Sequence, residues 1–109
     1  MNKEKIIKNS ETYSEIINNG VVVKNKFISI YYQKNEDDTR YGITIPKKVG
    51  KAHIRNKLKR QAKNIITTNE ITIPKNYNYV IIIKEATLSL TYNEMACQLM
   101  ELFKKVRKK

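Results

Sequence analysis

The chain has 109 residues, which is enough for one folded domain and too few for two. Its 22 Lys and Arg residues outnumber its 10 Asp and Glu residues, so the formal net charge is +12. A small compact chain with this charge repels itself, and we therefore expect the charge to serve a polyanionic partner. Nucleic acid is the first candidate and an anionic membrane surface the second, while a merely soluble basic protein is the alternative without a partner.

The number of cysteines and the length of the apolar runs indicate the cellular compartment in which the protein is expected. The single cysteine, Cys97, cannot form an intramolecular disulfide, and its place in an apolar helical pattern predicts a reduced thiol in the core. The charged N-terminus does not resemble a signal peptide, and no stretch approaches the ~20 apolar residues that a membrane span needs. We therefore expect a soluble, cytoplasmic protein with one domain over residues 1–109, ending in a basic tail at about 104–109.

The first predicted element is a helix over 10–19, because its apolar residues recur at helical spacing. This apolar face consists of Tyr13, Ile16 and Ile17. Gly20 follows the last helical residue, where glycine commonly ends a helix in the left-handed conformation.

Two strands are predicted next. Residues 21–32 are rich in β-branched and aromatic side chains and indicate one long strand. A polar loop over 34–39 leads to a second strand over 40–45, which ends at Pro46 because proline has no N–H to donate. The simplest pairing of the two strands is an antiparallel hairpin. Farther along, residues 77–84 form a continuous apolar run, which is typical of a strand buried on both faces.

Two more helices complete the predicted order. One covers about residues 50–66. The other begins at Thr91, since Thr91 and Glu94 have the spacing of a capping box. The apolar stripe of the last helix predicts core packing and consists of Tyr92, Met95, Ala96, Leu99, Leu102, Phe103 and Val106. The sequence therefore predicts a small α+β domain with the order α-β-β-α-β-α.

The helix over 50–66 has an unusual charge pattern. Between residues 47 and 63 there are eight Lys and Arg residues and no acid. On a helical wheel, a narrow apolar face is followed by a broad cationic one. The apolar face consists of Ile54, Leu58, Ala62 and Ile65; the cationic face consists of Arg55, Asn56, Lys57, Lys59, Arg60 and Lys63. A solvated structural helix usually mixes charge signs, so this pattern favours contact with RNA phosphates.

The run over 46–60, PKKVGKAHIRNKLKR, strongly resembles the signature of the protein subunit of bacterial ribonuclease P. In that family a KK-hydrophobic-G-x-A segment is followed by a helix of the RNR type. Weaker similarity extends upstream through residues 9–20 and the strand ending at Ile30 and Tyr31, and downstream through 79–83 and 90–92. The resemblance therefore covers most of the chain, and its central motif is specific in length and order.

The resemblance implies a fold like that of ribosomal protein S5 domain 2, with a left-handed βαβ crossover. It also implies a division of labour in which the RNA subunit, with Mg²⁺ bound mainly by that RNA, hydrolyses the phosphodiester and removes the 5′ leader of precursor tRNA. The protein binds ribonuclease P RNA and holds the single-stranded leader, and no obligate protein partner is expected. The chain also has no paired carboxylates or Cys/His cluster spaced for metal or nucleophile chemistry, and His53 lies on the polar side of its helix.

Carried over by position, the resemblance assigns RNA contacts to Arg55, Asn56, Lys57, Lys59 and Arg60, and Lys47, Lys48 and Lys51 extend this set. The charge pattern of the helix adds Lys63. The resemblance assigns the leader cleft to Tyr13, Ile17 and Tyr31, although core packing is an equally good account of Tyr13 and Ile17. Two positions depart from the family pattern. Lys57 stands where a second Arg is common, and Ile17 stands where a second aromatic is common.

Two alternatives remain open at the level of sequence. A ribosomal or other structured-RNA-binding protein of the same domain type would have no role in tRNA processing, but it would not need the ordered signature over 46–60. Membrane-surface binding through the basic C-terminal helix is the weaker alternative, because the apolar stripe of that helix is accounted for by the core.

Overall fold

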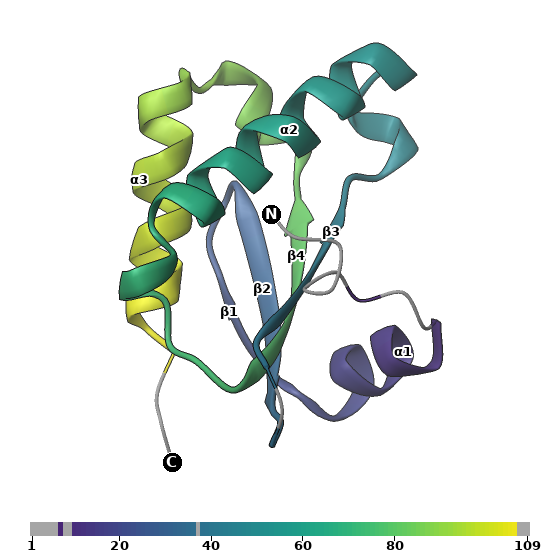
Figure 1. Ribbon diagram of the computed structural model, residues 1–109. Coiled ribbons are helices and arrows are strands. Elements are labelled where there is room, and N and C mark those ends of the chain that lie inside the picture. The colour runs from purple at the N-terminus through teal and green to yellow at the C-terminus, as the bar shows by residue number, and fades with distance from the viewer. Residues whose placement is uncertain (1–6, 8–9, 37, 107–109) are drawn as a thin grey trace.

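The computed structural model describes residue 7 and residues 10–36 and 38–106, and it has the predicted α+β class. A four-stranded sheet carries α1 on one face and α2 and α3 on the other (Figure 1). The helices and strands are α1 Ser10–Asn19, β1 Val21–Lys24, β2 Ile28–Lys34, β3 Arg40–Thr44, α2 Ala52–Thr68, β4 Tyr77–Ile83 and α3 Tyr92–Lys104. Three short 3₁₀ helices connect them: η2 Lys47–Val49, η3 Glu70–Thr72 and η4 Glu85–Ser89.

The single long strand expected over 21–32 is wrong, because the chain reverses at Asn25 to form two antiparallel strands. The Asn25 side-chain oxygen accepts hydrogen bonds from the backbone N–H groups of Phe27 and Ile28, at 2.8 and 2.9 Å. The Asn25 side chain thus supplies the hydrogen-bond acceptor that these backbone N–H groups would otherwise find in a neighbouring strand. Asn commonly stabilises turns by bonding to nearby backbone in this way. The element order therefore contains one strand more than expected.

The predicted hairpin between the strands over 21–32 and 40–45 is also wrong. The strand order is β1-β2-β4-β3, so β4 lies between β2 and β3. It pairs antiparallel with β2 and parallel with β3. As predicted, β4 is buried on both faces: Tyr79 and Ile81 face α2 and α3, while Val80 lies under α1. A strand with two apolar faces is the natural centre of a sheet covered on both sides.

The connection from β3 through α2 to β4 is left-handed, as the family resemblance implied. In Figure 1 both strands run upward, α2 crosses on the viewer's side, and β4 lies to the left of β3. Parallel strands joined by a helix are almost always connected with the opposite hand. This arrangement lays α2 across the β3 edge of the sheet.

The main core lies between the sheet and the pair α2 and α3. It includes four tyrosines and a phenylalanine from β2, β3, β4 and α3, whose rings lie 5.1 to 6.3 Å apart between centroids. The capping box of α3 is confirmed, with Thr91 Oγ1 accepting from Glu94 N at 3.2 Å and Glu94 Oε1 from Thr91 N at 2.9 Å. None of the helices in the described part of the chain is long and apolar enough to cross a membrane.

Two local expectations are wrong. Cys97 is exposed, because α3 buries Met95 and Leu99 and so turns Cys97 outward. Gly20 does end α1, but its φ is not positive. Glycine is needed there for close approach, since a Cβ atom would collide with the Ile16 carbonyl oxygen and lie 2.7 Å from the Tyr32 carbonyl oxygen.

Candidate nucleic-acid interface

The start of α2 gathers exposed cations around a helix N-terminus. Lys47 and Lys48 are exposed on η2, whose third residue, Val49, is buried and anchors this segment to the core. Lys51 is the N-cap residue of α2, and no described side chain caps it. Because the first turn of a helix carries free N–H groups and a partial positive charge, this end of α2 favours anions.

Arg55 is held in place by the segment that precedes the helix. Its Nε donates a hydrogen bond of 3.1 Å to the Gly50 carbonyl oxygen, and the side chain is half-buried. The terminal nitrogens of its guanidinium remain for another acceptor. Gly50 itself packs closely on Ile54, because an added Cβ would lie 3.2 Å from the Ile54 Cγ2 atom. The backbone at Gly50 therefore approaches α2 closely and orients the Arg55 side chain.

The cations of α2 occupy two flanks of the helix and the crest between them. The Asn64 side-chain nitrogen donates to the Tyr92 hydroxyl at 2.7 Å, which marks the flank that faces α3. Lys57 lies on this α3 flank by its position on the wheel. Arg55, Lys59 and Lys63 follow at intervals of four on the opposite flank, toward β3. The remaining predicted residues, Asn56 and Arg60, are exposed along the crest.

The predicted leader residues lie on the other face of the sheet. Tyr13 and Tyr31 are half-buried against the same small cluster as Ile16 and Val80, so the structure brings these two tyrosines together. Ile17 is 40 % exposed on the outer side of α1. Tyr13 therefore combines core packing with partial exposure, whereas Ile17 is a surface residue.

Tyr13 is fixed by contact with β3. Its phenol ring lies directly over Gly42, where an added Cβ would overlap the ring and its hydroxyl. Burial raises the pKa of the Tyr13 hydroxyl, and a hydrogen bond with the Thr44 side chain partly offsets the rise. Gly42 was absent from the predicted site, although a glycine inside a strand is a known signal of close approach.

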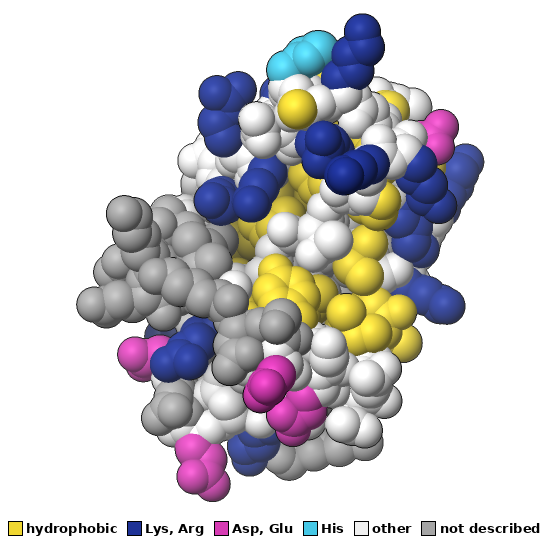
Figure 2. All heavy atoms as spheres, turned by 90° about the vertical axis from the view of Figure 1, so that its right-hand side faces the viewer, with side chains coloured by type: hydrophobic (Ala, Val, Ile, Leu, Met, Phe, Trp, Pro, Cys, Tyr) yellow, Lys and Arg dark blue, Asp and Glu magenta, His cyan; other side chains and the backbone are white. Residues whose placement is uncertain are grey.

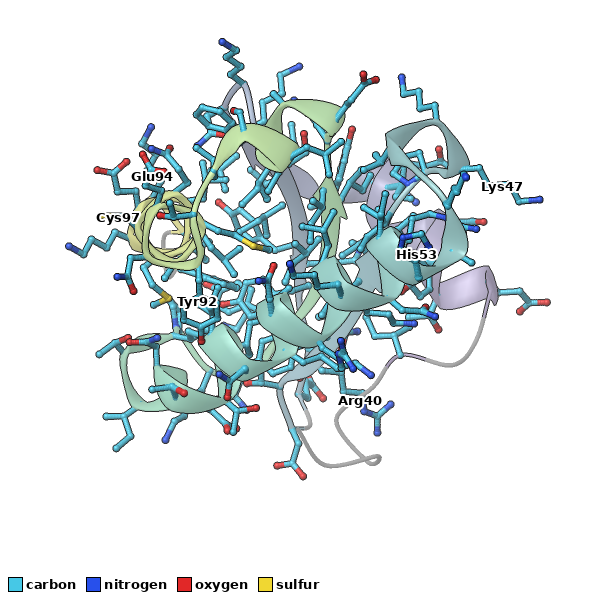
Figure 3. The ribbon with its side chains drawn as sticks, turned by 90° about the horizontal axis from the view of Figure 1, so that it is seen from above. Arg40, Lys47, His53, Tyr92, Glu94 and Cys97 are labelled. Carbon is cyan, nitrogen blue, oxygen red and sulfur yellow. The ribbon has the colours of Figure 1, made fainter. Side chains whose placement is uncertain are left out.

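Figure 2 views the face of the molecule that carries α1. Lys and Arg side chains gather over the upper part and along the right-hand side of this face, around a central area of hydrophobic side chains, and an acidic side chain also lies at the upper right; further acidic side chains lie below, together with some Lys and Arg. In Figure 3, Lys47 and His53 project at one end of α2, away from Cys97 and Glu94 on α3. His53 is exposed, as predicted. No group of three or more His, Cys, Asp or Glu residues suited to a metal ion occurs in the described part of the chain.

The fold is a small α+β domain in which a helix with cations on one side lies beside a partly apolar sheet face. These features place the chain in the class of nucleic-acid-binding domains. The family model described as ribonuclease P matches residues 1–107. The chain therefore belongs to the ribonuclease P protein family, as a protein subunit of the enzyme that acts in tRNA 5′ processing.

Relatives and solved structures agree with this assignment. The ribonuclease P protein component of Mycoplasma capricolum is 37% identical over 111 residues, covering 98% of this chain and all of the relative. That of Exiguobacterium sibiricum is 31% identical, covering 96% and 92%. The structure of the Thermotoga maritima ribonuclease P protein superposes with a TM-score of 0.88 at 27% identity, covering 94% of this chain and 97% of that one.

Proposed function

We propose that this chain binds the RNA subunit of ribonuclease P and the 5′ leader of precursor tRNA, and that the RNA subunit with Mg²⁺ performs the hydrolysis. The observation that carries the proposal is the one-sided charge of α2 and of the segment that leads into it. Eight cations and no acid lie between residues 47 and 63, and the helix start has no side-chain cap. Phosphates would satisfy both the cations and the free N–H groups of the first turn.

The energetics of α2 alone favour a bound polyanion. Lys51, Arg55, Lys59 and Lys63 repeat at intervals of four, and each like-charged pair at this spacing destabilises a helix by ~0.2–0.5 kcal/mol. Two of these pairs, Arg55–Lys59 and Lys59–Lys63, lie within α2 and together cost about 0.4–1 kcal/mol on that scale. Phosphates placed along the ladder reverse the sign of this contribution, so RNA binding stabilises the helix as well as the complex.

The sheet face next to α1 is the proposed surface for the leader. Tyr31 is half-buried and presents part of its ring, and stacking of a base on an aromatic ring contributes ~1–3 kcal/mol. Tyr13 contributes mainly by fixing α1, because its ring is held against Gly42. Ile17 offers apolar contact without stacking, which predicts weaker leader binding at that point than an aromatic residue would give.

The proposal assigns positioning, and not cleavage, to the protein. The Mg²⁺ ions of the reaction are assigned to the RNA subunit, whose phosphate oxygens are hard ligands of the kind that Mg²⁺ prefers. When bound there, Mg²⁺ supplies the nucleophile and the leaving-group stabilisation for phosphodiester hydrolysis. The protein contributes cations that bring two polyanionic RNAs together, which lowers the concentration of Mg²⁺ needed for them to associate.

Reconstitution tests the proposal directly. The purified chain is added to a cognate ribonuclease P RNA, and cleavage of precursor tRNA is measured over a range of Mg²⁺ concentrations. We expect the chain to restore cleavage at a low Mg²⁺ concentration at which the RNA alone is inactive. No stimulation at any Mg²⁺ concentration would contradict the proposal and would favour a structured-RNA-binding protein that has no part in tRNA processing.

A further inference from the structure

The pairing register places four residues from four strands in one row across the sheet. Lys24 of β1 is opposite Ser29 of β2, Ser29 is opposite Ile82 of β4, and Ile82 is opposite Thr44 of β3. Residues paired in this way point to the same face. That face is the one that carries α1, because Ile82 packs against the cluster around Ile16.

This row adjoins the row that α1 covers. Tyr13 lies over Gly42, and Ile16 packs against Val80. Among the described contacts, Tyr13 meets the row from Lys24 to Thr44 only through its hydrogen bond with the Thr44 side chain. The ends of the row are exposed, at Thr44 and Lys24, whereas Ser29 in its middle is buried and Ile82 is partly exposed. Three inter-strand spacings separate these ends, or about 14 Å between Cα atoms.

One end of the row already belongs to the proposed RNA surface. From Thr44 the chain continues into η2 and the cationic start of α2. The opposite end is also cationic, because Lys24 is exposed on β1; Lys26 is exposed in the turn that follows, with its Nζ atom 5.8 Å from the centroid of the Phe27 ring. Residues 21–34 contain no acid.

The turn that carries these lysines is held by distant parts of the chain. The Asn25 side-chain nitrogen donates to the Gln98 side-chain oxygen at 3.0 Å, which ties the turn to α3. Lys84 Nζ donates to the Asn25 carbonyl oxygen at 2.8 Å, and Thr87 Oγ1 donates to the Phe27 carbonyl oxygen at 2.8 Å. The backbone between Lys24 and Phe27 is therefore positioned before any ligand binds, which reduces the entropy lost on binding.

We propose that Lys24 and Lys26 form a second phosphate-binding side of the leader surface, opposite the start of α2. This inference rests on the proposed function. A single strand crossing the row meets cations on both sides, while its bases face Ile82 and the adjacent Tyr31, which are partly exposed; Ser29 itself is buried. Bases in a duplex are paired and stacked on one another, so they cannot reach this floor; the arrangement therefore selects single-stranded RNA.

Leader length provides the test. Holoenzyme is reconstituted with wild-type protein, Lys24→Gln or Lys26→Gln, and its affinity is measured for precursor tRNA with a long leader and with a leader of a single nucleotide. We expect each variant to bind the long-leader substrate about two- to fivefold more weakly, as for loss of one exposed ionic contact. Its salt slope should fall by ~0.7, the value for one phosphate of a single strand. Binding of the short-leader substrate should not change.

Matched variants complete the design. Lys104→Gln removes an exposed lysine from the end of α3 and should leave both affinities unchanged, whereas Lys24→Arg should retain the wild-type leader effect. An equal loss for the two substrates, or no loss for either, would overturn the inference while leaving the proposed function intact. If wild-type protein does not stimulate the RNA at all, the proposed function itself fails. Unfolding midpoints of all variants, measured in urea, identify any that are misfolded.

Discussion

Arg55 Nε and the Gly50 carbonyl oxygen are joined by a hydrogen bond of 3.1 Å, so a residue two positions before α2 orients the guanidinium of the fourth residue of the helix. Lysine cannot reproduce this arrangement, because its ammonium is a point charge on a flexible stem. The pair therefore separates two contributions of Arg55 to RNA binding, its charge and its fixed direction.

Arg55→Lys tests the contribution of direction. We expect it to weaken binding to ribonuclease P RNA about tenfold, because a hydrogen bond to a charged group contributes ~1.5–3 kcal/mol and part of it is lost. The salt slope should stay the same, since the charge is kept. Lys104→Arg, an exchange of cation type on α3 away from this surface, is the control. Equal affinity for Arg55→Lys and wild type would show that direction is unimportant. Binding is measured by titration of labelled RNA.

Lys59→Ala tests the flank of α2 that faces β3. The slope of log K against log salt should become shallower by ~0.7–0.9, because one phosphate contact and its released counterions are lost. Lys104→Ala on α3 removes the same charge at a distance and should leave the slope unchanged. If the two variants give the same slope, the effect is one of net charge, and this flank is not the contact surface.

Gly42→Ala tests how α1 is seated on the sheet. The added methyl group overlaps the Tyr13 ring, and such overpacking typically costs ~1–3 kcal/mol in the free energy of unfolding. In a Tyr13→Ala background the same change should cost little, because the obstructing ring is absent. The free energy of unfolding is measured with urea for all four proteins. Equal costs in the two backgrounds would contradict the contact.

Tyr41→Phe tests the response of the core to alkaline pH. Burial, and secondarily the charge of Glu70, raise the pKa of the Tyr41 hydroxyl well above its usual value. Below pH ~10 the tyrosine is neutral in both states, and its stabilising contribution is complete. Above that pH it ionises in the unfolded chain first, so stability falls by ~1.4 kcal/mol per pH unit for this residue. Stability should fall less steeply in Tyr41→Phe than in wild type; identical slopes above pH ~10 would contradict the raised pKa.

Thr91→Ala removes the cap of α3. We expect a loss of ~1 kcal/mol in the free energy of unfolding, the usual effect of replacing a capping threonine. Asn93→Ala changes an exposed residue of the same turn and should have a much smaller effect. Urea unfolding measures both, and similar losses would mean that the cap contributes nothing specific.

Features that depend only on residues close together in the sequence were predicted well. The apolar run of β4, the capping box at Thr91 and the one-sided α2 depend on neighbours within a few residues. The division of residues 21–32 into two strands could not be predicted in this way, because the turn at Asn25 is supported by Gln98, 73 positions away. The pairing of β4 between β2 and β3 is equally non-local, since an apolar strand does not specify its partners.

In the candidate site, too, the features set by local sequence were predicted and those set by distant contacts were not. The residue types of α2 and their spacing predicted a cationic surface, and every exposed lysine of that set lies where RNA could reach it. The bond from Arg55 to Gly50 and the seating of Tyr13 on Gly42 depend on backbone paths that no helical wheel contains. Lys24 was missed because only the register of the sheet relates it to β3.

The position of β4 also sets the order in which the chain can fold as it is made. β2 and β3 both need β4 as their neighbour, yet β4 is made after α2. Until residue 83 is available, the sheet consists of the β1–β2 hairpin alone, and an isolated hairpin is marginally stable. The cationic segment over 47–63 is therefore synthesised before the sheet that supports it. We expect RNA present during synthesis to meet this segment while it is still unfolded, so that assembly of the complex and completion of the fold occur together.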